Sequence, residues 1–310
     1  MSRRAALDHV LGLVAGAPCG ESLVLRGSMT MLAWVGDRAR PPGDLDWVVR
    51  PPAGVPVDDL SPYPFVDRLD PVRLWPAVAH GAGRYQIWTF EEYDTGGFAP
   101  RVPPEGLHWV TAEELCCVDR PHLDVLDLVR ERPRTDGGMV FDPDAATVDA
   151  TWGYAYESAD GAGGGGVRIT LPWHTSGERG DIQLDFAYDE QLPDPPTFVA
   201  VPRGDGGPPT VVWSASRELS LTWKVQWLAT DRTRDGRVAG KDLYDAVLLA
   251  ELAGTWLPDR LRRRVLRSVS DPDAVRGWAV DWTGLAGHVT GGPREWLDRL
   301  AEALRHLHDV

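Results

Sequence analysis

Residues 22–49 read SLVLRGSMTMLAWVGDRARPPGDLDWVV, and this stretch decides the fold. The run Ser22–Leu25 predicts a strand that ends at Arg26-Gly27-Ser28, and Ser28–Val35 predicts a helix. A loop with two prolines follows, and residues 44–49 then predict a second strand. Because successive side chains of a strand point to opposite faces, Asp44 and Asp46 share one face, opposite the three apolar residues Leu45, Trp47 and Val49.

Asp44 and Asp46 are the strongest candidates for chemistry in this stretch. Two carboxylates on one face of a strand repel each other unless a cation lies between them. A pair of magnesium ions takes oxygen ligands, and two-metal sites stabilise both the attacking and the leaving oxygen of a phosphoryl displacement. We therefore expect Asp44 and Asp46 to hold two Mg²⁺. Two other Asp-x-Asp motifs, at residues 142–144 and 271–273, contain proline and are interpreted as turns.

Gly27-Ser28 places backbone N–H groups and a hydroxyl at the start of a helix, which suits a triphosphate. Arg26 beside it offers a permanent cation. The alternative for this motif is a simple helix cap without a ligand.

Asp185 is the candidate third carboxylate, either as a metal ligand or as the group that takes the acceptor's proton. It lies in the predicted strand Asp181–Tyr188, with Leu184 and Phe186 on the other face. The alternative is an exposed strand face, because Asp181 and Gln183 share its parity. The sequence leaves both interpretations open.

The rest of the chain predicts an α+β fold with two lobes, residues 1–205 and residues 206–310. A helix is expected at Ala5–Ala15, and further strands are expected at Tyr85–Phe90, Thr151–Tyr156 and Val167–Leu171. Residues Pro193–Pro209 are interpreted as a linker. Four helices follow, at Arg217–Ala229, Lys241–Leu252, Pro258–Arg267 and Arg294–His306. The first of these is contested, because apolar residues alternate strictly over 219–227, as in a strand, whereas Ser214, Ser216 and Glu218 favour the start of a helix.

Four motifs in a fixed order carry a family resemblance. They are Leu25-Arg26-Gly27-Ser28, Asp44-Leu45-Asp46, Trp223-Lys224-Val225-Gln226-Trp227-Leu228 and Gly240-Lys241-Asp242-Leu243-Tyr244-Asp245. In this order, over residues 22–251, the chain resembles the AbiEii-type nucleotidyltransferase toxins of type IV abortive-infection systems, within the polymerase-β-like nucleotidyltransferase superfamily. The resemblance implies a mixed-sheet catalytic lobe, a helical C-terminal lobe, and an NTP held between them with magnesium. It also favours the helix at Arg217–Ala229.

The resemblance also implies roles for single residues. Gly27 and Ser28 would bind the triphosphate, Asp44 and Asp46 the metals, and Lys224 the phosphates of the nucleotide. Asp242 would act as a base or position the acceptor, with Lys241, Tyr244 and Asp245 in support. Each of these two residues also has a purely structural alternative. Lys224 would cover apolar surface with its side chain, and Asp242 would stabilise the start of a helix.

The chain also departs from the family pattern at its first motif. Family members often carry a lysine and a second glycine where this chain has Arg26 and Ser28, and the 15 residues between Ser28 and Asp44 make a long gap. Both departures concern the binding of the triphosphate more than the fold.

The acceptor and the partners are expectations from the same resemblance, which implies a tRNA 3′ end or a protein as acceptor and a cognate antitoxin as partner. The one dense basic stretch consists of five arginines between Arg260 and Arg267. Such a cluster can steer a phosphate backbone, although a solvated basic face is the common alternative.

Composition limits the other function classes. A net charge of -14 argues against coating by nucleic acid or by an anionic membrane, and three cysteines are too few for a disulfide framework. No signal peptide and no apolar run of about 20 residues is visible, so we expect a cytoplasmic protein without membrane contact. Two rival functions are a carbohydrate-active hydrolase, given 14 tryptophans and paired carboxylates, and a non-catalytic nucleotide-sensing or partner-binding protein of the same fold.

Overall fold

The computed structural model describes residues 2–50, 120–154, 164–188, 190, 192–253, 257–285 and 289–308. Contacts group the chain into one compact unit of Met1–Val49 and Pro121–Val310 and a second unit of Arg50–Arg120. All helices and strands with described bounds belong to the first unit. The expected strand Tyr85–Phe90 lies outside the described residues.

The stretch that decides the fold forms the elements expected of it. Helix α1 (Ser2–Ala15) is followed by a 3₁₀ turn and strand β1 (Leu23–Arg26). Helix α2 (Ser28–Val35) and strand β2 (Asp44–Val49) have the predicted bounds. β1 and β2 pair antiparallel, so that Arg26 lies beside Asp46.

The sheet continues with strands that the sequence predicted only in part. After α6 (Pro121–Glu131) come β3 (Val140–Phe141), β4 (Thr147–Asp149), β5 (Gly153–Tyr154), β6 (Gly164–His174) and β7 (Arg179–Ala187). The expected strands at Val167–Leu171 and Asp181–Tyr188 are confirmed as β6 and β7. Asp142 and Asp271 each cap a short 3₁₀ helix that begins with a proline, which confirms these two Asp-x-Asp motifs as turns.

The expected linker at Pro193–Pro209 is wrong in its middle. Residues 197–201 form strand β8 (Thr197–Val201), which pairs antiparallel with β9 (Thr210–Ser214). The β-branched and aromatic residues of Thr-Phe-Val-Ala-Val favour a strand, and prolines on both sides confine it to an edge position. Because prolines at both ends of the segment favour a linker, the sequence pattern does not predict this strand.

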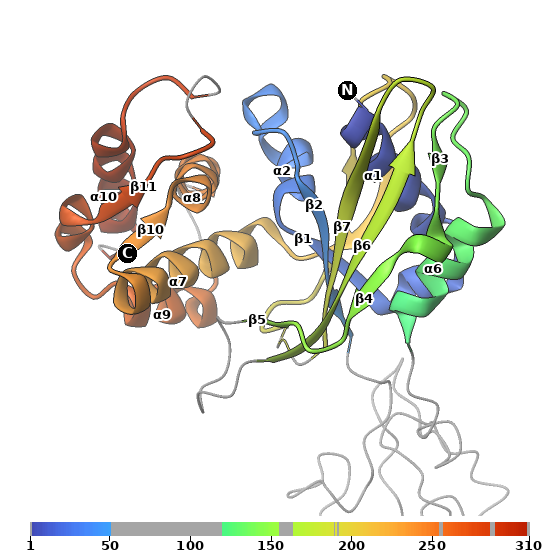
Figure 1. Ribbon diagram of the computed structural model, residues 1–310. Helices are drawn as coiled ribbons and strands as arrows, with labels where there is room; N and C mark the ends of the chain where they lie inside the picture. The colour runs from blue at the N-terminus through green and yellow to red at the C-terminus, as the bar shows by residue number, and fades with distance from the viewer. Residues whose placement is uncertain are drawn as a thin grey trace, which may run out of the picture. The chain divides into compact units, whose positions relative to one another are not determined.

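The sheet is mixed, and helices cover its two faces. Its order is β3-β6-β7-β2-β1-β9-β8, with β4 and β5 also paired to β6. β2 pairs parallel with β7, and β1 parallel with β9. Helices α1 and α6 lie on one side of the sheet, and the helical lobe lies on the other (Figure 1). The expected α+β class, a mixed-sheet lobe followed by a helical lobe, is confirmed.

The helical lobe contains α7 (Arg217–Asp235), α8 (Gly240–Ala253), α9 (Asp259–Ser268) and α10 (Pro293–His308), together with the short parallel pair β10 (Arg237–Ala239) and β11 (Ala279–Asp281). All four expected helices are confirmed. Ser216 caps α7 by accepting a hydrogen bond from the Leu219 N–H at 3.1 Å, and Gly236 ends the helix in the left-handed conformation.

The alternating pattern in α7 has a physical cause. Leu219, Trp223 and Trp227 pack toward the sheet with Val24 and Val48, whereas Leu221, Val225 and Leu228 belong to the core of the helical lobe. A helix buried on two sides needs two apolar stripes, and these two stripes together imitate the period of a strand.

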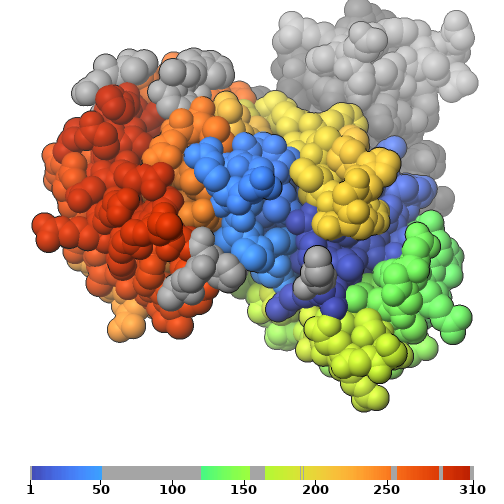
Figure 2. Space-filling model, turned by 90° about the horizontal axis from the view of Figure 1, so that it is seen from above, coloured from blue at the N-terminus to red at the C-terminus, as the bar shows by residue number. Residues whose placement is uncertain are grey.

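Three apolar cores therefore hold the described unit together: one between α1, α6 and the sheet, one inside the helical lobe, and a small one between α7 and the sheet. Helix α2 contacts both α8 and β8. Figure 2 shows its light-blue surface between the red and orange helical lobe and the yellow β8–β9 segment. The two lobes thus meet around α2 and α7. The expected boundary between residues 205 and 206 stays a prediction, and β9, which lies after it, belongs to the sheet.

Among the described helices, none has the length and apolar character needed to cross a membrane.

Candidate active site

A row of four charged side chains crosses the middle of the sheet. Register pairs Arg168 of β6 with Asp185 of β7, Asp185 with Asp46 of β2, and Asp46 with Arg26 of β1. Paired residues on neighbouring strands share a face, and Asp44 lies on this same face two residues before Asp46. It is the face that α7 covers, so the row lies between the sheet and the helical lobe.

The carboxylate of Asp185 is fully engaged. Arg168 donates two hydrogen bonds to it, each of 2.8 Å, and Gln183 donates a third of 2.9 Å. Only 3% of Asp185 is exposed, so it does not lie on an open strand face. Its position beside Asp46 suits a third metal ligand, although three of the roughly four acceptor sites of the carboxylate already accept hydrogen bonds.

Arg26 lies in the interior instead of facing a nucleotide. It is 1% exposed and pairs with the buried Glu190. Its guanidinium lies 5.5 Å from the ring centroid of Trp223 and 5.7 Å from that of Trp227. These contacts tie β1 to α7 and account for the two tryptophans of the Trp-Lys-Val-Gln-Trp motif.

Asp44 and Asp46 differ from Asp185. Among the described residues, neither has an arginine or lysine within ion-pairing distance, and the Ser28 hydroxyl donates a 3.2 Å hydrogen bond to Asp44. Burial raises the pKa of Asp46 to about 8, the charges of Asp44 and Asp185 add to this, and Arg26 and Lys224 oppose it. The sheet thus concentrates negative charge at Asp44 and Asp46.

Gly27 makes this arrangement possible. Its φ of +77° is a conformation that side chains disfavour, and a Cβ at this position would lie 2.4 Å from Oδ2 of Asp46. Gly27 directly precedes α2, so the turn brings the first N–H groups of α2 close to the Asp46 carboxylate. The expected neighbourhood of Gly27, Ser28, Asp44 and Asp46 therefore exists.

The donor set fits a divalent cation with an open coordination sphere. Two aspartates offer hard oxygen ligands, and Mg²⁺ usually takes one or two carboxylates together with waters and substrate phosphates. Burial, together with the charges of Asp44 and Asp185, raises the pKa of Asp46, so a cation bound there would favour the charged form of this carboxylate. In the described part of the chain, no three or more His, Cys, Asp or Glu side chains are grouped so that they could hold a metal ion.

The helical lobe contributes a buried charge network opposite this site. Lys224 of α7 donates to Asp242 at 2.5 Å and lies 3.4 Å from Asp245, both on α8. Arg40, in the loop before β2, grips Asp245 through Nε and Nη2 at 3.0 to 3.2 Å. Burial by itself would lower the pKa of Lys224, but Asp242 and Asp245 outweigh burial and raise it. Lys224 is therefore a permanent cation, 5% exposed, and does not merely cover apolar surface.

Charges of the two lobes act on each other across the space between them. Lys224 lowers the pKa of Asp46, while Asp245 and Asp242 of α8 are among the groups that raise the pKa of Arg40. The Tyr244 hydroxyl of α8 also donates a 2.5 Å hydrogen bond to the Arg38 carbonyl, next to the same loop. These interactions support one shared site for the expected residues of both lobes.

Sequence reasoning missed four residues of this neighbourhood: Arg40, Arg168, Gln183 and Glu190. Strand geometry could have indicated two of them. Gln183 lies two residues before Asp185 on the same strand, and Arg168 is the residue that pairs with Asp185 on the neighbouring strand. Arg40 and Glu190 lie in loops, where no periodicity marks them.

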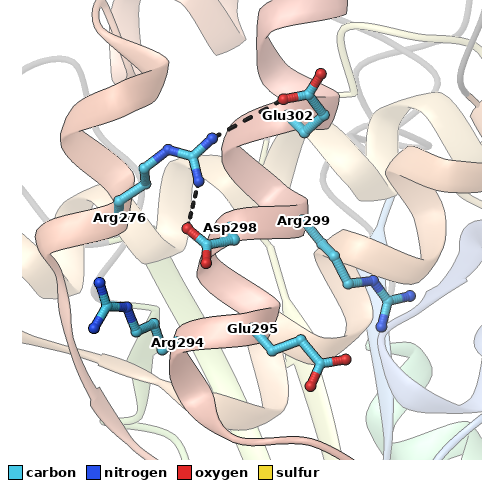
Figure 3. A pocket seen from close by; sticks show the side chains of 6 residues that line it. All are labelled: Arg276, Arg294, Glu295, Asp298, Arg299 and Glu302. Carbon is cyan, nitrogen blue, oxygen red and sulfur yellow. Dashed lines mark hydrogen bonds and ion pairs between the residues drawn. The ribbon is translucent and has the colours of Figure 1, made fainter.

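Two other hollows lie apart from these carboxylates. One, of about 620 Å³, lies on α10, where Arg276 points toward Asp298 and Glu302 (Figure 3). The other, of about 1110 Å³, lies between α1, the end of α6 and the turn between β8 and β9. Five arginines line it, of which Arg4, Arg130 and Arg203 each pair with an aspartate. Neither hollow contains residues of the charged row.

A family model described as "Nucleotidyl transferase AbiEii toxin, Type IV TA system" matches residues 123–309. The chain belongs to this family. The match covers Asp185, Lys224, Asp242 and Asp245, whereas Gly27, Ser28, Asp44 and Asp46 lie before it.

Comparison with solved structures gives two similar chains from Helicobacter pylori. JHP933 is 13% identical with a TM-score of 0.49, and the alignment covers 100% of this chain and 94% of that one. A protein described as a proposed nucleotidyltransferase is 14% identical with a TM-score of 0.49, covering 99% and 93%. Comparison with curated proteins gives no match. Membership of the AbiEii family thus rests on the family model.

Proposed function

We propose that this AbiEii-family chain is a magnesium-dependent nucleotidyltransferase that moves a nucleotide from an NTP onto an acceptor. The observation that carries the proposal is the pair Asp44 and Asp46, two carboxylates without cation partners among the described residues, facing a helical lobe that holds a buried lysine. Family membership supports the reaction class.

The proposed reaction is a single displacement. An acceptor oxygen forms a bond to the α-phosphorus, the bond from that phosphorus to the bridging oxygen breaks, and pyrophosphate leaves with the electron pair. The acceptor's proton passes to water. Two Mg²⁺ held by Asp44 and Asp46, with Asp185 as a candidate further ligand, would supply positive charge at the reacting phosphate.

The protein's own contribution is positioning and charge. Gly27 and Ser28 present the start of α2 to the phosphates, and Lys224 supplies a fixed cation from the opposite lobe. Lys241 is a further nucleotide-binding candidate at the start of α8. Burial would raise the pKa of Asp242, but Lys224 and Lys241 outweigh burial and lower it, so Asp242 suits holding Lys224 in place better than accepting a proton.

The proposed acceptor is tRNA. The exposed arginines Arg263 and Arg267 on α9 support an RNA partner, although Arg260 and Arg262 of the same helix pair with Asp194 and Asp259. A protein acceptor is the alternative. We also propose a cognate antitoxin as the partner implied by a type IV toxin-antitoxin family.

The test is transfer of label from each of four α-³²P NTPs, with Mg²⁺, to total tRNA or to protein. We expect transfer by the wild type and none by Asp44→Asn or Asp46→Asn. Asp144→Asn is the matched control, since it changes an exposed aspartate of another Asp-x-Asp motif. Wild-type rates from Asp46→Asn, or no transfer from any NTP, would contradict the proposal, and the latter would leave a non-catalytic nucleotide sensor.

A further inference from the structure

The lysines of this chain are confined to the candidate site. Of the 32 Lys and Arg residues, only Lys224 and Lys241 are lysines, and 17 positions separate them. Arginine serves for every other positive charge. Lysine differs from arginine in carrying a compact, strongly hydrated charge. Lys224 lies in the buried network with Asp242 and Asp245, whereas Lys241 is exposed and has no ion pair among the described residues.

Lys241 lines a cavity at the junction of the two lobes. The cavity has a volume of about 370 Å³, within the range of small-molecule sites, and its walls come from the loop before β2, the start of α8 and the turn after β11. Arg40 and Lys241 contribute its cations, Pro41 and Leu285 its apolar surface, and Asp281 and Thr283 its other polar side chains. We call this the Arg40 cavity.

Arg40 connects the Arg40 cavity to the paired carboxylates. Its Nε and Nη2 donate hydrogen bonds to Asp245, and the same residue lines the cavity. It stands four residues before Asp44, a span of at most about 14 Å of extended chain, and Asp44 is among the charges that raise its pKa. A ligand that reaches from Asp44 to Lys241 would pass Arg40.

The other cations of the site are already engaged. Arg26 is buried with Glu190, Arg168 holds Asp185, and Lys224 holds Asp242 and Asp245. An NTP bound at Asp44 and Asp46 still needs positive charge for the phosphates that leave. Asp281 lies in the same cavity wall, but its carboxylate accepts a 3.0 Å hydrogen bond from the Thr283 N–H, which fixes it within its own turn.

We propose that the Arg40 cavity binds the β- and γ-phosphates of the NTP, with Lys241 and Arg40 as their cationic ligands. This inference rests on the proposed function and deepens it, because it assigns the pyrophosphate part of the substrate to a place in the fold. The proposal gives this role to Lys241 and Arg40 instead of Arg26, which is buried and pairs with Glu190.

The scarcity of lysine gives a direct test by acetylation of the full-length protein with mass mapping. Lys241 is exposed and Lys224 is buried, so a lysine-acylating reagent should modify Lys241 and the N-terminal amine and leave Lys224 unmodified. We expect Mg²⁺ with pyrophosphate, tripolyphosphate or NTP to slow acetylation of Lys241 at least tenfold. The N-terminal amine is the internal control, and a nucleoside without phosphates should protect nothing.

Variants supply the second measurement. Lys241→Ala should weaken binding of Mg²⁺-pyrophosphate about 10- to 100-fold in calorimetry, the loss of one charged hydrogen bond, while Lys241→Arg should retain part of it. Arg267→Ala is the matched control, an exposed cation on α9 outside the cavity. Arg40→Lys, which keeps the charge facing Asp245, should show a smaller loss than Lys241→Ala.

The outcomes separate this inference from the proposed function. Nucleotide transfer with no protection of Lys241 and unchanged binding by Lys241→Ala would overturn the inference and leave the proposed function in place. Protection by tripolyphosphate without transfer of any nucleotide would support the phosphate site and contradict the proposed transferase activity.

Discussion

At the scale of the residue, function depends on which charges have partners. Two ion pairs lie in or beside the row that crosses the sheet: Arg168 with Asp185, and Arg26 with Glu190. Asp44 and Asp46 have no such partner among the described residues, and burial, together with the charges of Asp44 and Asp185, raises the pKa of Asp46. Removing a partner from a buried pair is expected to destabilise the fold, whereas removing Asp46 should relieve repulsion.

Gly27→Ala should lower both stability and activity. A side chain at φ +77° and ψ −149°, a region essentially limited to glycine, costs about 1–3 kcal/mol, and its Cβ would also displace the Asp46 carboxylate. Gly36→Ala is a matched control, because Gly36 also has a positive φ, of +57°, with nothing within 4 Å of its Cβ. Chemical denaturation and transfer assays compare the two variants. Equal activity in both would show that the contact with Asp46 is unimportant.

Asp46 should make the metal-free protein less stable as pH rises. Its folded pKa of about 8 exceeds its ordinary value of 3.8, so the folded state binds more protons than the unfolded state between these values. The stability from this group is therefore full below about pH 4 and is lost as pH rises through about 8. In EDTA, the melting temperature of the wild type should fall from pH 5 to pH 9 more steeply than that of Asp46→Asn. Parallel curves would contradict the raised pKa.

At the scale of the element, α7 serves both lobes at once. One apolar stripe of α7 packs on the sheet, the other enters the helical core, and Lys224 lies between them against α8. Because α7 is packed on two sides, the Lys224 ammonium has little freedom to move. The α7–α8 pair thus sets the position of the charge that faces Asp46.

Lys224→Ala should cost about 10²–10³ in transfer rate, the usual loss for one charge-stabilising donor. It should also destabilise the fold by about 3–5 kcal/mol, because Asp242 and Asp245 lose a buried partner.

The double variant Lys224→Met with Asp242→Asn separates these two effects. It removes one charge of each sign, so it should recover stability in denaturation experiments while the transfer rate stays low. Recovery of the rate along with stability would mean that Lys224 is only structural.

At the scale of the whole molecule, the sheet joins segments from distant parts of the chain. β1 lies between β2 and β9, so residues 23–26 pair with residues on both sides of the expected boundary at 205. The small core between α7 and the sheet, with Val24, Val48, Trp223 and Trp227, closes the contact between the lobes. The lobes therefore depend on each other for folding.

A chain of residues 1–205 should fail to fold cooperatively. It lacks β9, which would leave β1 with an open edge and β8 without the strand it pairs with. A chain of residues 1–216 retains β9 and should show more strand structure by circular dichroism, although its face toward α7 stays uncovered. Cooperative melting of residues 1–205 with the strand content of the longer chain would contradict this.

Local patterns in the sequence determined the elements of the first fifty residues and the four helices after residue 216. Apolar runs, the alternation around Asp44 and Asp46, and the caps of the helices act over a few residues, so they can be found without the fold. The same patterns made Asp44 and Asp46 candidates, and the order of four motifs gave the family resemblance, which added Lys224.

Tertiary structure alone decided which charges are free. Arg26 looked available beside Gly27-Ser28, but Glu190, 164 positions later, neutralises it under two tryptophans of α7. Arg40 and Lys241 come from different lobes and meet only in the fold. Burial and ion pairing depend on segments brought together by the sheet, whose partners are set by long-range packing, so no local pattern could reveal them.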